Sequence, residues 1–212
     1  MKYYIDKLQK AYKHGLGKVL IGQAKKRVYY LLYVTYHFDK WHLYRPFETT
    51  NYKQMIVKII DPILEKDSTV VDVGCGTGQI LRHIRKSRRI GIDLDKQALQ
   101  CGELLNKFTN PPIEYLEGSI AKVSELNTPV KALILTNWLH AYDDTWITEN
   151  LCQLFKNNIV EHCLVDEVFT QKDRIKNIFS KFGTATIIEN DWQDKKNIFL
   201  FKINNPTTGV QA

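Results

Sequence analysis

The chain of 212 residues is long enough for one well-buried α/β domain and too short for two of ordinary size. Its apolar content of 44% and charged content of 25% are those of an ordinary globular protein. The four cysteines show no C-x-x-C pair and no metal-type spacing with histidine, so no metal site is expected. Their sparse use, and an N-terminus without the apolar core of a signal peptide, favour a cytoplasmic protein.

The net charge of +7 is concentrated at the N-terminus. Residues 1–45 hold ten Lys or Arg against two acids, a net charge of +8, whereas the remainder holds twenty against twenty-one. Residues 1–36 are predicted to be largely helical, and the basic triplet Lys25-Lys26-Arg27 interrupts the apolar span that a transmembrane helix needs. Three interpretations stay open: a helix on an anionic membrane surface, an RNA-binding face, or a helix packed over the domain as a lid or homodimer contact.

A second helix is predicted over residues 49–64, after a linker rich in aromatic and histidine side chains. The stretch Val70 to Leu81 then reads as a buried strand, a turn with glycines at 74, 76 and 78, and the start of a helix. The glycine spacing differs from the G-x-G-x-x-G of dinucleotide-binding loops, and no Gly-Lys-Ser or Gly-Lys-Thr of a P-loop follows. Asp72, just before the turn, would repel a diphosphate and favours a ligand with positive charge, such as an ammonium or a sulfonium.

These residues carry a family resemblance. Val71 to Gly78 resembles motif I of the class I S-adenosylmethionine-dependent methyltransferases, and Arg89 to Asp95 resembles the family's next strand, whose terminal acid, Asp93 here, holds the ribose hydroxyls. The resemblance implies a Rossmann-like α/β sheet of seven mostly parallel strands with an antiparallel closing hairpin, and S-adenosyl-L-methionine as cofactor. The cofactor-binding residues it implies are Asp72, Gly74, Cys75, Gly76, Gly78, Asp93, Leu94, Ser119, Ile120 and Asn137.

At Ser119 this chain departs from the family pattern, and Ser119 and Ile120 are alternatives for contact with the adenine. Many relatives carry Gly-Asp where this chain has Gly118-Ser119, and the acid accepts a hydrogen bond from the adenine amino group. The Ser119 hydroxyl can accept the same bond more weakly, or Ile120 can stack beside the ring.

In this family a helix before motif I covers the ligand, so Trp41-His42 is expected either to line the pocket or to anchor a surface turn.

The remaining elements follow in the order expected of that fold. The domain is predicted to run over residues 49–203, with an N-terminal extension and linker over 1–48 and a polar tail over 204–212. Its predicted helices after motif I cover residues 79–86, 96–108, 143–157 and 172–182. Its predicted strands after motif I cover residues 88–93, 113–116, 131–136 and 159–165, followed by the hairpin 184–189 and 197–202.

The chemistry of the acceptor rests on fewer signals. His140 follows the fourth strand, at the carboxyl edge where open α/β sheets bind ligands, and is the first candidate for a general base; the alternative is that it braces the loop. His42 and His37 are the next candidates, and Asp166 or Glu167 could orient a hydroxyl or an imidazole. Asn137-Trp138 lacks the two prolines of relatives that methylate planar nitrogens, which favours oxygen as the acceptor. The sequence has no acidic cluster for a magnesium-dependent catechol-type site.

A looser resemblance covers the arrangement from Phe38 through motif I to His140, which looks like a group of short bacterial methyltransferases associated with surface-polysaccharide synthesis. It implies a small-molecule or glycan acceptor, with a sugar hydroxyl favoured, and the basic helix of residues 1–36 would fit a lipid-linked glycan near a membrane. The alternatives are an RNA or protein methyltransferase that docks through the basic helix, with nucleic acid the less favoured partner, and a non-catalytic protein that binds S-adenosylmethionine.

Overall fold

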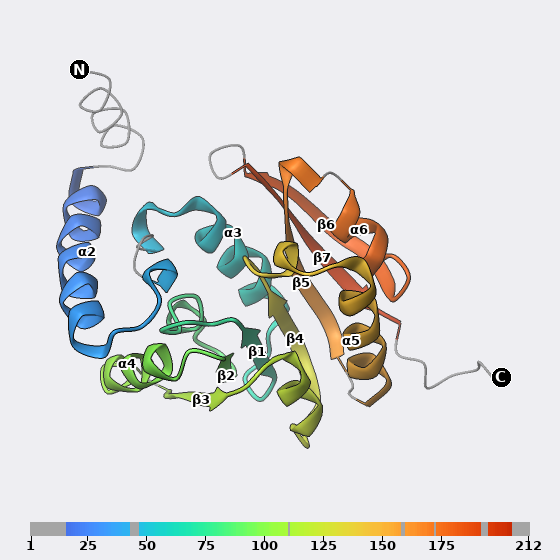
Figure 1. Cartoon of the computed structure of the whole chain (residues 1–212), viewed down its shortest axis with the longest axis horizontal. Helices are drawn as coiled ribbons and strands as arrows, with labels where there is room; N and C mark the ends of the chain where they lie inside the picture. The colour runs from blue at the N-terminus through green and yellow to red at the C-terminus, as the bar shows by residue number, and fades with distance from the viewer. Residues whose placement is uncertain are drawn as a thin grey trace.

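The computed structural model describes residues 16–42, 47–109, 111–157, 160–171, 173–191 and 195–204. Its centre is a sheet of seven strands in the order β3-β2-β1-β4-β5-β7-β6 (Figure 1). The strands are β1 (Thr69–Val73), β2 (Arg88–Asp93), β3 (Ile113–Glu117), β4 (Val130–Leu135), β5 (Val160–Val168), β6 (Gly183–Asp191) and β7 (Lys196–Ile203).

The first five strands are parallel, whereas β7 pairs antiparallel with both β5 and β6. This arrangement confirms the predicted Rossmann-like sheet with its antiparallel closing hairpin. The strand order reverses between β1 and β4, so the carboxyl ends of these two strands open a crevice in which such sheets bind ligands.

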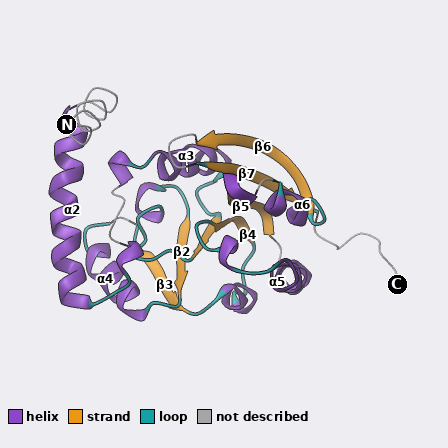
Figure 2. Cartoon of the chain, turned by 45° about the horizontal axis from the view of Figure 1, so that its top comes forward, coloured by secondary structure: helices purple, strands orange, loops and turns teal. Residues whose placement is uncertain are grey.

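Helices cover both faces of the sheet (Figure 2). They are α2 (Leu16–Tyr36), α3 (Asn51–Ile60), α4 (Lys96–Asn106), α5 (Asp144–Asn157) and α6 (Arg174–Phe179). On one face, side chains of α5 and α6 pack on alternate residues of the strands, among them Val71, Leu133 and Phe199. On the other face, α3 and α4 pack on the intervening residues, such as Val70 and Ile134. Both faces are apolar because a parallel sheet is buried on both sides.

The helix predicted over residues 79–86 is wrong: the structure has only a short 3-10 turn, η4 (Leu81–His83). Nine residues separate Gly78 from the start of β2, which leaves little room for a full helix and its return. Arg89, 1% exposed, donates from one guanidinium nitrogen to the carbonyl oxygens of Leu81 (3.1 Å) and Ile84 (2.8 Å). A buried side chain from the next strand therefore satisfies carbonyl groups that a longer helix would have satisfied itself.

The N-terminal extension packs beside this short turn. Arg82 donates to the Tyr29 hydroxyl on α2 (2.6 Å), and the Phe47 ring stacks on His83 with centroids 3.5 Å apart. Other aromatic and aliphatic residues of α2 surround the buried Phe38, together with Ala98 and Cys101 of α4; these α2 residues are Tyr29, Leu32, Tyr33 and Tyr36. The described part of the extension is thus a helix packed over the domain at the β3 side (Figure 1).

The remaining predictions about the chain ends fall partly outside the described residues, namely on residues 1–15 of the extension and 205–212 of the tail. Within the described part of the chain, no helix is both long and apolar enough to cross a membrane. The helix predicted over 172–182 is shorter, since α6 covers only six residues.

Candidate active site

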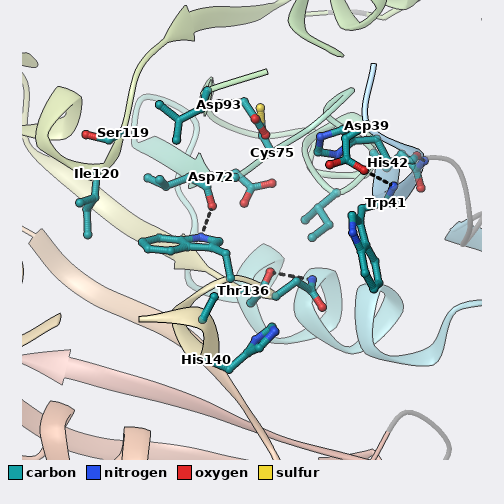
Figure 3. Close-up of a pocket in the computed structure, with 18 of the residues that line it drawn as sticks. Asp39, Trp41, His42, Asp72, Cys75, Asp93, Ser119, Ile120, Thr136 and His140 are labelled. Carbon is teal, nitrogen blue, oxygen red and sulfur yellow. Dashed lines mark hydrogen bonds between the residues drawn. The ribbon is translucent and has the colours of Figure 1, made fainter. Parts of the chain in front are cut away.

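A cavity of about 910 Å³ opens at the carboxyl ends of β1, β2 and β4. In Figure 3, Ser119 and Ile120 lie on one side of it, and Trp41 and His42 lie on the opposite side. The strand ends supply its floor, and residues from α3 and the start of β7 complete its walls. This volume is near the upper end of the range of about 300–1,000 Å³ typical of small-molecule sites.

The motif I turn forms the floor of the cavity. Gly74 (φ 77°) and Gly76 (φ 53°) adopt backbone conformations that side-chain-bearing residues rarely adopt. Each also lies against a ring: a Cβ on Gly74 would stand 2.7 Å from Cδ1 of Trp138, and one on Gly76 would stand 2.2 Å from Nδ1 of His42. The amide nitrogens of Gly74 and Cys75 donate to the carbonyl oxygen of Ile92, which fixes the turn on β2.

Gly78 faces away from this cavity. A Cβ at this position would lie 2.2 Å from the hydroxyl oxygen of Tyr115, which donates to the carbonyl oxygen of Thr77 (3.2 Å). Neither Gly76 nor Gly78 lines the cavity, whereas Gly74 and Cys75 do. The Cys75 thiol is buried, and burial raises its pKa well above the ordinary value, so it lies in its neutral form against the ligand space.

Asp93 lies at the end of β2, where its side chain organises the turn and lines the cavity. One carboxylate oxygen accepts from the amide of Gly76 (2.6 Å), and the other accepts from the amide of Asp95 (2.9 Å). Each oxygen keeps a second lone pair that a ligand hydroxyl can use. Leu94, 68% exposed, forms the adjoining rim.

Asp72 is buried in the floor at 2% exposure. Burial, followed by the negative charge of Asp93, raises the pKa of its carboxyl from 3.8 to about 8, while the nearby Lys53 ammonium acts in the opposite direction. Lys53, on α3, donates to the side-chain oxygen of Gln79 (2.7 Å). A cationic group that enters the cavity beside Asp72 would stabilise its ionised form.

The side of the cavity beyond β3 is built by Gly118, Ser119 and Ile120. The Ser119 hydroxyl oxygen caps the 3-10 helix η5 (Ile120–Glu125) by accepting from the amide of Ala121 (3.3 Å). Ile120 is 3% exposed and presents an apolar surface. Both residues suggested for the adenine ring therefore border the same space.

The linker after α2 closes the other side. The amide of Asp39 donates to the Asp95 carboxylate (2.8 Å), and Nε2 of His42 lies 3.6 Å from the same oxygen. The side-chain amide of Gln79 donates to the carbonyl oxygen of His42 (3.3 Å), and Trp41 stands 86% exposed at the rim. Trp41 and His42 thus line the cavity instead of only anchoring a surface turn.

His37 is not among the residues that line this cavity. It has a left-handed backbone (φ 57°), and its amide donates to the carbonyl oxygen of Tyr33, so it ends α2. Glu167 is also committed elsewhere, because its two carboxylate oxygens accept from the amides of Asp173 and Ile175 at the start of α6. Neither residue is brought to the ligand space in the way the sequence suggested.

At the end of β4, Asn137 is held in a left-handed conformation (φ 73°). Its amide donates to one Asp166 oxygen (2.7 Å), and its side-chain oxygen accepts from the Lys196 ammonium, which also pairs with the other Asp166 oxygen. The same ammonium lies 5.0 Å from the centre of the Tyr52 ring. The side chains of Lys196 and Asp166 are 8% and 2% exposed, so the pair is shielded from water.

Beyond Asn137, aromatic rings and His140 surround the remaining space. The Tyr142 and Trp146 rings stack with centroids 4.0 Å apart, and Trp138 meets both edge-on. The backbone of this loop is braced by Arg174, which donates to the Asp144 carboxylate and to the Tyr142 carbonyl oxygen. His140 is solvent-exposed and lines the cavity in the same loop.

Comparison with known proteins bears on what this cavity does. Residues 70–157 match the family described as "Methyltransferase domain". This part of the chain is therefore similar to a methyltransferase domain. The matched segment takes in motif I, Asp93 and the loop with Asn137 and His140, so the elements that build the cavity floor lie within it.

Curated relatives add to this match. A ribosomal protein L11 methyltransferase of Clostridium botulinum is 33% identical over 134 residues, which are 59% of this chain and 41% of the relative; the same protein of a second strain matches equally. The chain thus spans about 41% of the length of the curated relatives it matches. The matched segment and these relatives thus show a likeness to methyltransferases.

Solved structures share the fold of the methyltransferase domain. The magnesium protoporphyrin IX methyltransferase of Synechocystis, solved with S-adenosylmethionine bound, superposes with a TM-score of 0.60 at 11% identity, over 73% of this chain and 79% of that one. An rRNA methylase of Streptococcus thermophilus gives a TM-score of 0.56 at 15% identity over 76% of this chain and 98% of that one. At these identities the likeness shows the fold alone.

The likeness to methyltransferases implies S-adenosylmethionine as methyl donor. The cavity fits this molecule: Asp93 presents a carboxylate to hydroxyl groups, Asp72 favours a cation, and Ile120 offers an apolar wall to a ring. Among the described residues, no group of three or more His, Cys, Asp or Glu side chains is placed to hold a metal ion. Sequence reasoning missed Tyr52, Lys53 and Lys196, since no local motif marks them.

Proposed function

We propose that the chain transfers the methyl group of S-adenosylmethionine to an oxygen of a small molecule or glycan, with a sugar hydroxyl as the favoured acceptor. The observation that carries this proposal is the composition of the cavity beyond Asn137. Three aromatic rings and the imidazole of His140 border a recessed space large enough for a donor and a small acceptor. Aromatic faces suit the apolar faces of ring-shaped acceptors.

In this proposal the donor lies along the motif I turn. Asp93 binds the ribose hydroxyls, Asp72 faces the cationic part of the donor, and Gly118 to Ile120 hold the adenine ring. The donor supplies an activated methyl group on a sulfonium sulfur, so the residues of the chain serve to orient the two molecules and exclude water. His42 and Trp41 cover the donor from the linker side.

The acceptor occupies the space between Asn137, Trp138 and Tyr142. Its hydroxyl oxygen attacks the methyl carbon as the carbon–sulfur bond breaks, and the hydroxyl proton passes to Nδ1 or Nε2 of His140, which acts as general base. Lys196 and Asp166 hold Asn137 in its left-handed conformation and so position the loop. The products are the methyl ether, S-adenosylhomocysteine and the protonated imidazole.

A protein acceptor is the second candidate, because the curated relatives are ribosomal protein L11 methyltransferases. The experiment is methyl transfer from tritium-labelled S-adenosylmethionine to three sets of acceptors: sugar nucleotides and lipid-linked sugars, ribosomal proteins, and RNA. Labelling of a sugar that is lost when its free hydroxyls are blocked supports the proposal. Labelling of protein or RNA alone overturns it, and binding of the donor without transfer to any set indicates a non-catalytic protein.

A further inference from the structure

The helix α2 carries an apolar stripe on its outer side. Five aliphatic residues of the helix are between 48% and 65% exposed: Leu20, Ile21, Val28, Leu31 and Val34. With successive residues about 100° apart, all five fall within an arc of about 140°. Tyr30, 59% exposed, lies beside this arc, and the basic side chain of Arg27 lies within it. A contiguous apolar surface of this kind marks a contact site.

The stripe is not a misplaced part of the core, because the opposite side of α2 is already packed. Tyr29, Leu32 and Tyr33 contact the cluster around Phe38, and the Tyr29 hydroxyl accepts from Arg82 (2.6 Å). Lys25 pairs with Glu48 from the following segment. The helix is therefore held with its apolar stripe turned away from the domain.

The charge around the stripe indicates what covers it. Helix α2 carries four basic residues, Lys18, Lys25, Lys26 and Arg27, and no acidic residue. A second copy of the chain on the same stripe would bring two such basic helices together and is disfavoured by their repulsion. RNA would use the basic side chains and leave five aliphatic groups without a function. An apolar face that includes Arg27, with Tyr30 beside it, on a helix without acidic residues matches the surface of an anionic lipid bilayer.

We propose that α2 docks the protein on an anionic membrane surface through the stripe formed by Leu20, Ile21, Val28, Leu31 and Val34. The aliphatic side chains enter the boundary between headgroups and acyl chains, and the basic residues pair with anionic headgroups. The helix lies on the bilayer and does not cross it. Because Phe38, Asp39 and Trp41 follow directly on α2, docking brings the linker side of the cavity close to the lipid surface.

This surface can be tested without any measurement of methyl transfer, so its failure is separate from failure of the proposed function. The full chain is mixed with sedimentable vesicles of phosphatidylcholine alone, or of equal parts phosphatidylcholine and phosphatidylglycerol. We expect partition into the pellet only with the anionic vesicles, and weaker partition at high salt. Ile21→Glu and Leu31→Glu should each lower the partition constant by about tenfold, since each replaces an inserted apolar group with a negative charge.

The chain offers a matched control. Ile188 on β6 is 52% exposed, as is Ile21, but lies on the strand at the opposite edge of the sheet from α2. Ile188→Glu should leave partition unchanged, and all variants should keep the thermal unfolding midpoint of the native chain within a few degrees. Equal binding of native chain and Ile21→Glu to anionic vesicles overturns the proposal. Two other results overturn it as well. One is that the native chain binds no vesicles and forms a dimer in sedimentation equilibrium, which Ile21→Glu dissociates. The other is that the native chain binds RNA and not vesicles.

Discussion

Nε1 of Trp138 donates a hydrogen bond of 2.8 Å to the carbonyl oxygen of Val73, and the indole ring lies against the backbone of Gly74. The bond joins the end of β1 to the loop after β4, the two strands between which the strand order reverses. It thereby fixes the aromatic wall of the acceptor space to the turn that we assign to the donor. One side chain therefore joins the two sides of the crevice.

Gly74→Ala is expected to lower the affinity for S-adenosylmethionine by tenfold to about a hundredfold. Its Cβ would stand 2.7 Å from Cδ1 of Trp138, and its φ of 77° is strained for alanine by about 1–2 kcal/mol. Isothermal titration calorimetry with S-adenosylmethionine measures the loss. Adding Trp138→Ala should restore part of the affinity, because it removes the clash and leaves the backbone strain. If the second substitution restores nothing, the ring contact is not the cause.

Asp72 is expected to link donor binding to pH. With its pKa raised to about 8 by burial, the ligand-free carboxyl is mostly protonated at pH 7. If the cationic donor requires the carboxylate, its affinity should rise by about tenfold per pH unit between pH 6 and about 8, then level off. Titration calorimetry at several pH values, in buffers of different ionisation enthalpy, should show release of about one proton. Asp72→Asn should bind weakly and without this slope.

The same group affects folding with a definite sign. Because its pKa in the folded chain lies above 3.8, the folded chain holds this proton more tightly than the unfolded chain does. The stabilisation it contributes is complete below pH 4 and is lost as pH rises through about 8. In the ligand-free protein, Asp72→Asn should therefore raise the free energy of unfolding at pH 9 by about 2–5 kcal/mol relative to native, with little difference at pH 4. Urea denaturation at both pH values measures the free energy of unfolding of the native chain and of Asp72→Asn. If the two proteins differ by the same amount at pH 4 and at pH 9, the pKa of Asp72 is not raised in the folded chain.

The fold was predictable because its signals are local. Runs of β-branched residues such as Val70 to Val73 favour buried strands, and glycines at 74 and 76 stand where the backbone takes positive φ. The failed helix over 79–86 has a cause that is not local. Arg89 binds the carbonyl groups of Leu81 and Ile84 from β2, which is paired with β1, and helical periodicity alone gives no sign of this contact.

Part of the site was predictable for the same reason. Asp72, Asp93 and Asn137 lie at or just beyond the carboxyl ends of buried strands, and parallel strands bring these ends to one edge. Lys196 was missed because it begins β7, and only the pairing of Lys196 with Val168 on β5 carries its side chain to Asp166. A lysine at the start of a hairpin strand is ordinarily a solvent-exposed residue, so the sequence offered no reason to select it.

Substitutions of His140 and His42 should affect different steps of the reaction. His140→Ala is expected to lower kcat by about a hundredfold or more and to leave donor affinity unchanged, since a general base contributes about 10²–10⁴-fold. His42→Ala should chiefly weaken donor binding, because the His42 ring lies against Gly76 and near Asp95. Steady-state kinetics with the acceptor found in the labelling experiment, together with calorimetry, distinguish the two. If His140→Ala keeps the native kcat but has a lower unfolding midpoint, His140 stabilises the loop and is not the general base.

Lys196 and Asp166 should be coupled in stability. Lys196→Met leaves a carboxylate of 2% side-chain exposure without its cation and is expected to lower the free energy of unfolding by about 3–5 kcal/mol. Combining Lys196→Met with Asp166→Asn should recover more than about 1 kcal/mol of the lost free energy of unfolding. The second substitution removes the buried negative charge, while its side-chain oxygen still accepts from the amide of Asn137.

The control for this cycle is the more exposed pair of Lys131 and Glu161, whose side chains are 21% and 44% exposed. Lys131→Met should cost no more than about 1 kcal/mol, since solvent screens such pairs. Urea unfolding of the native chain, the single variants and the double variant gives the coupling free energy directly. If Lys196→Met costs no more than Lys131→Met, the ammonium does not stabilise the buried carboxylate, and the position of Asn137 must depend on its backbone bond to Asp166 alone.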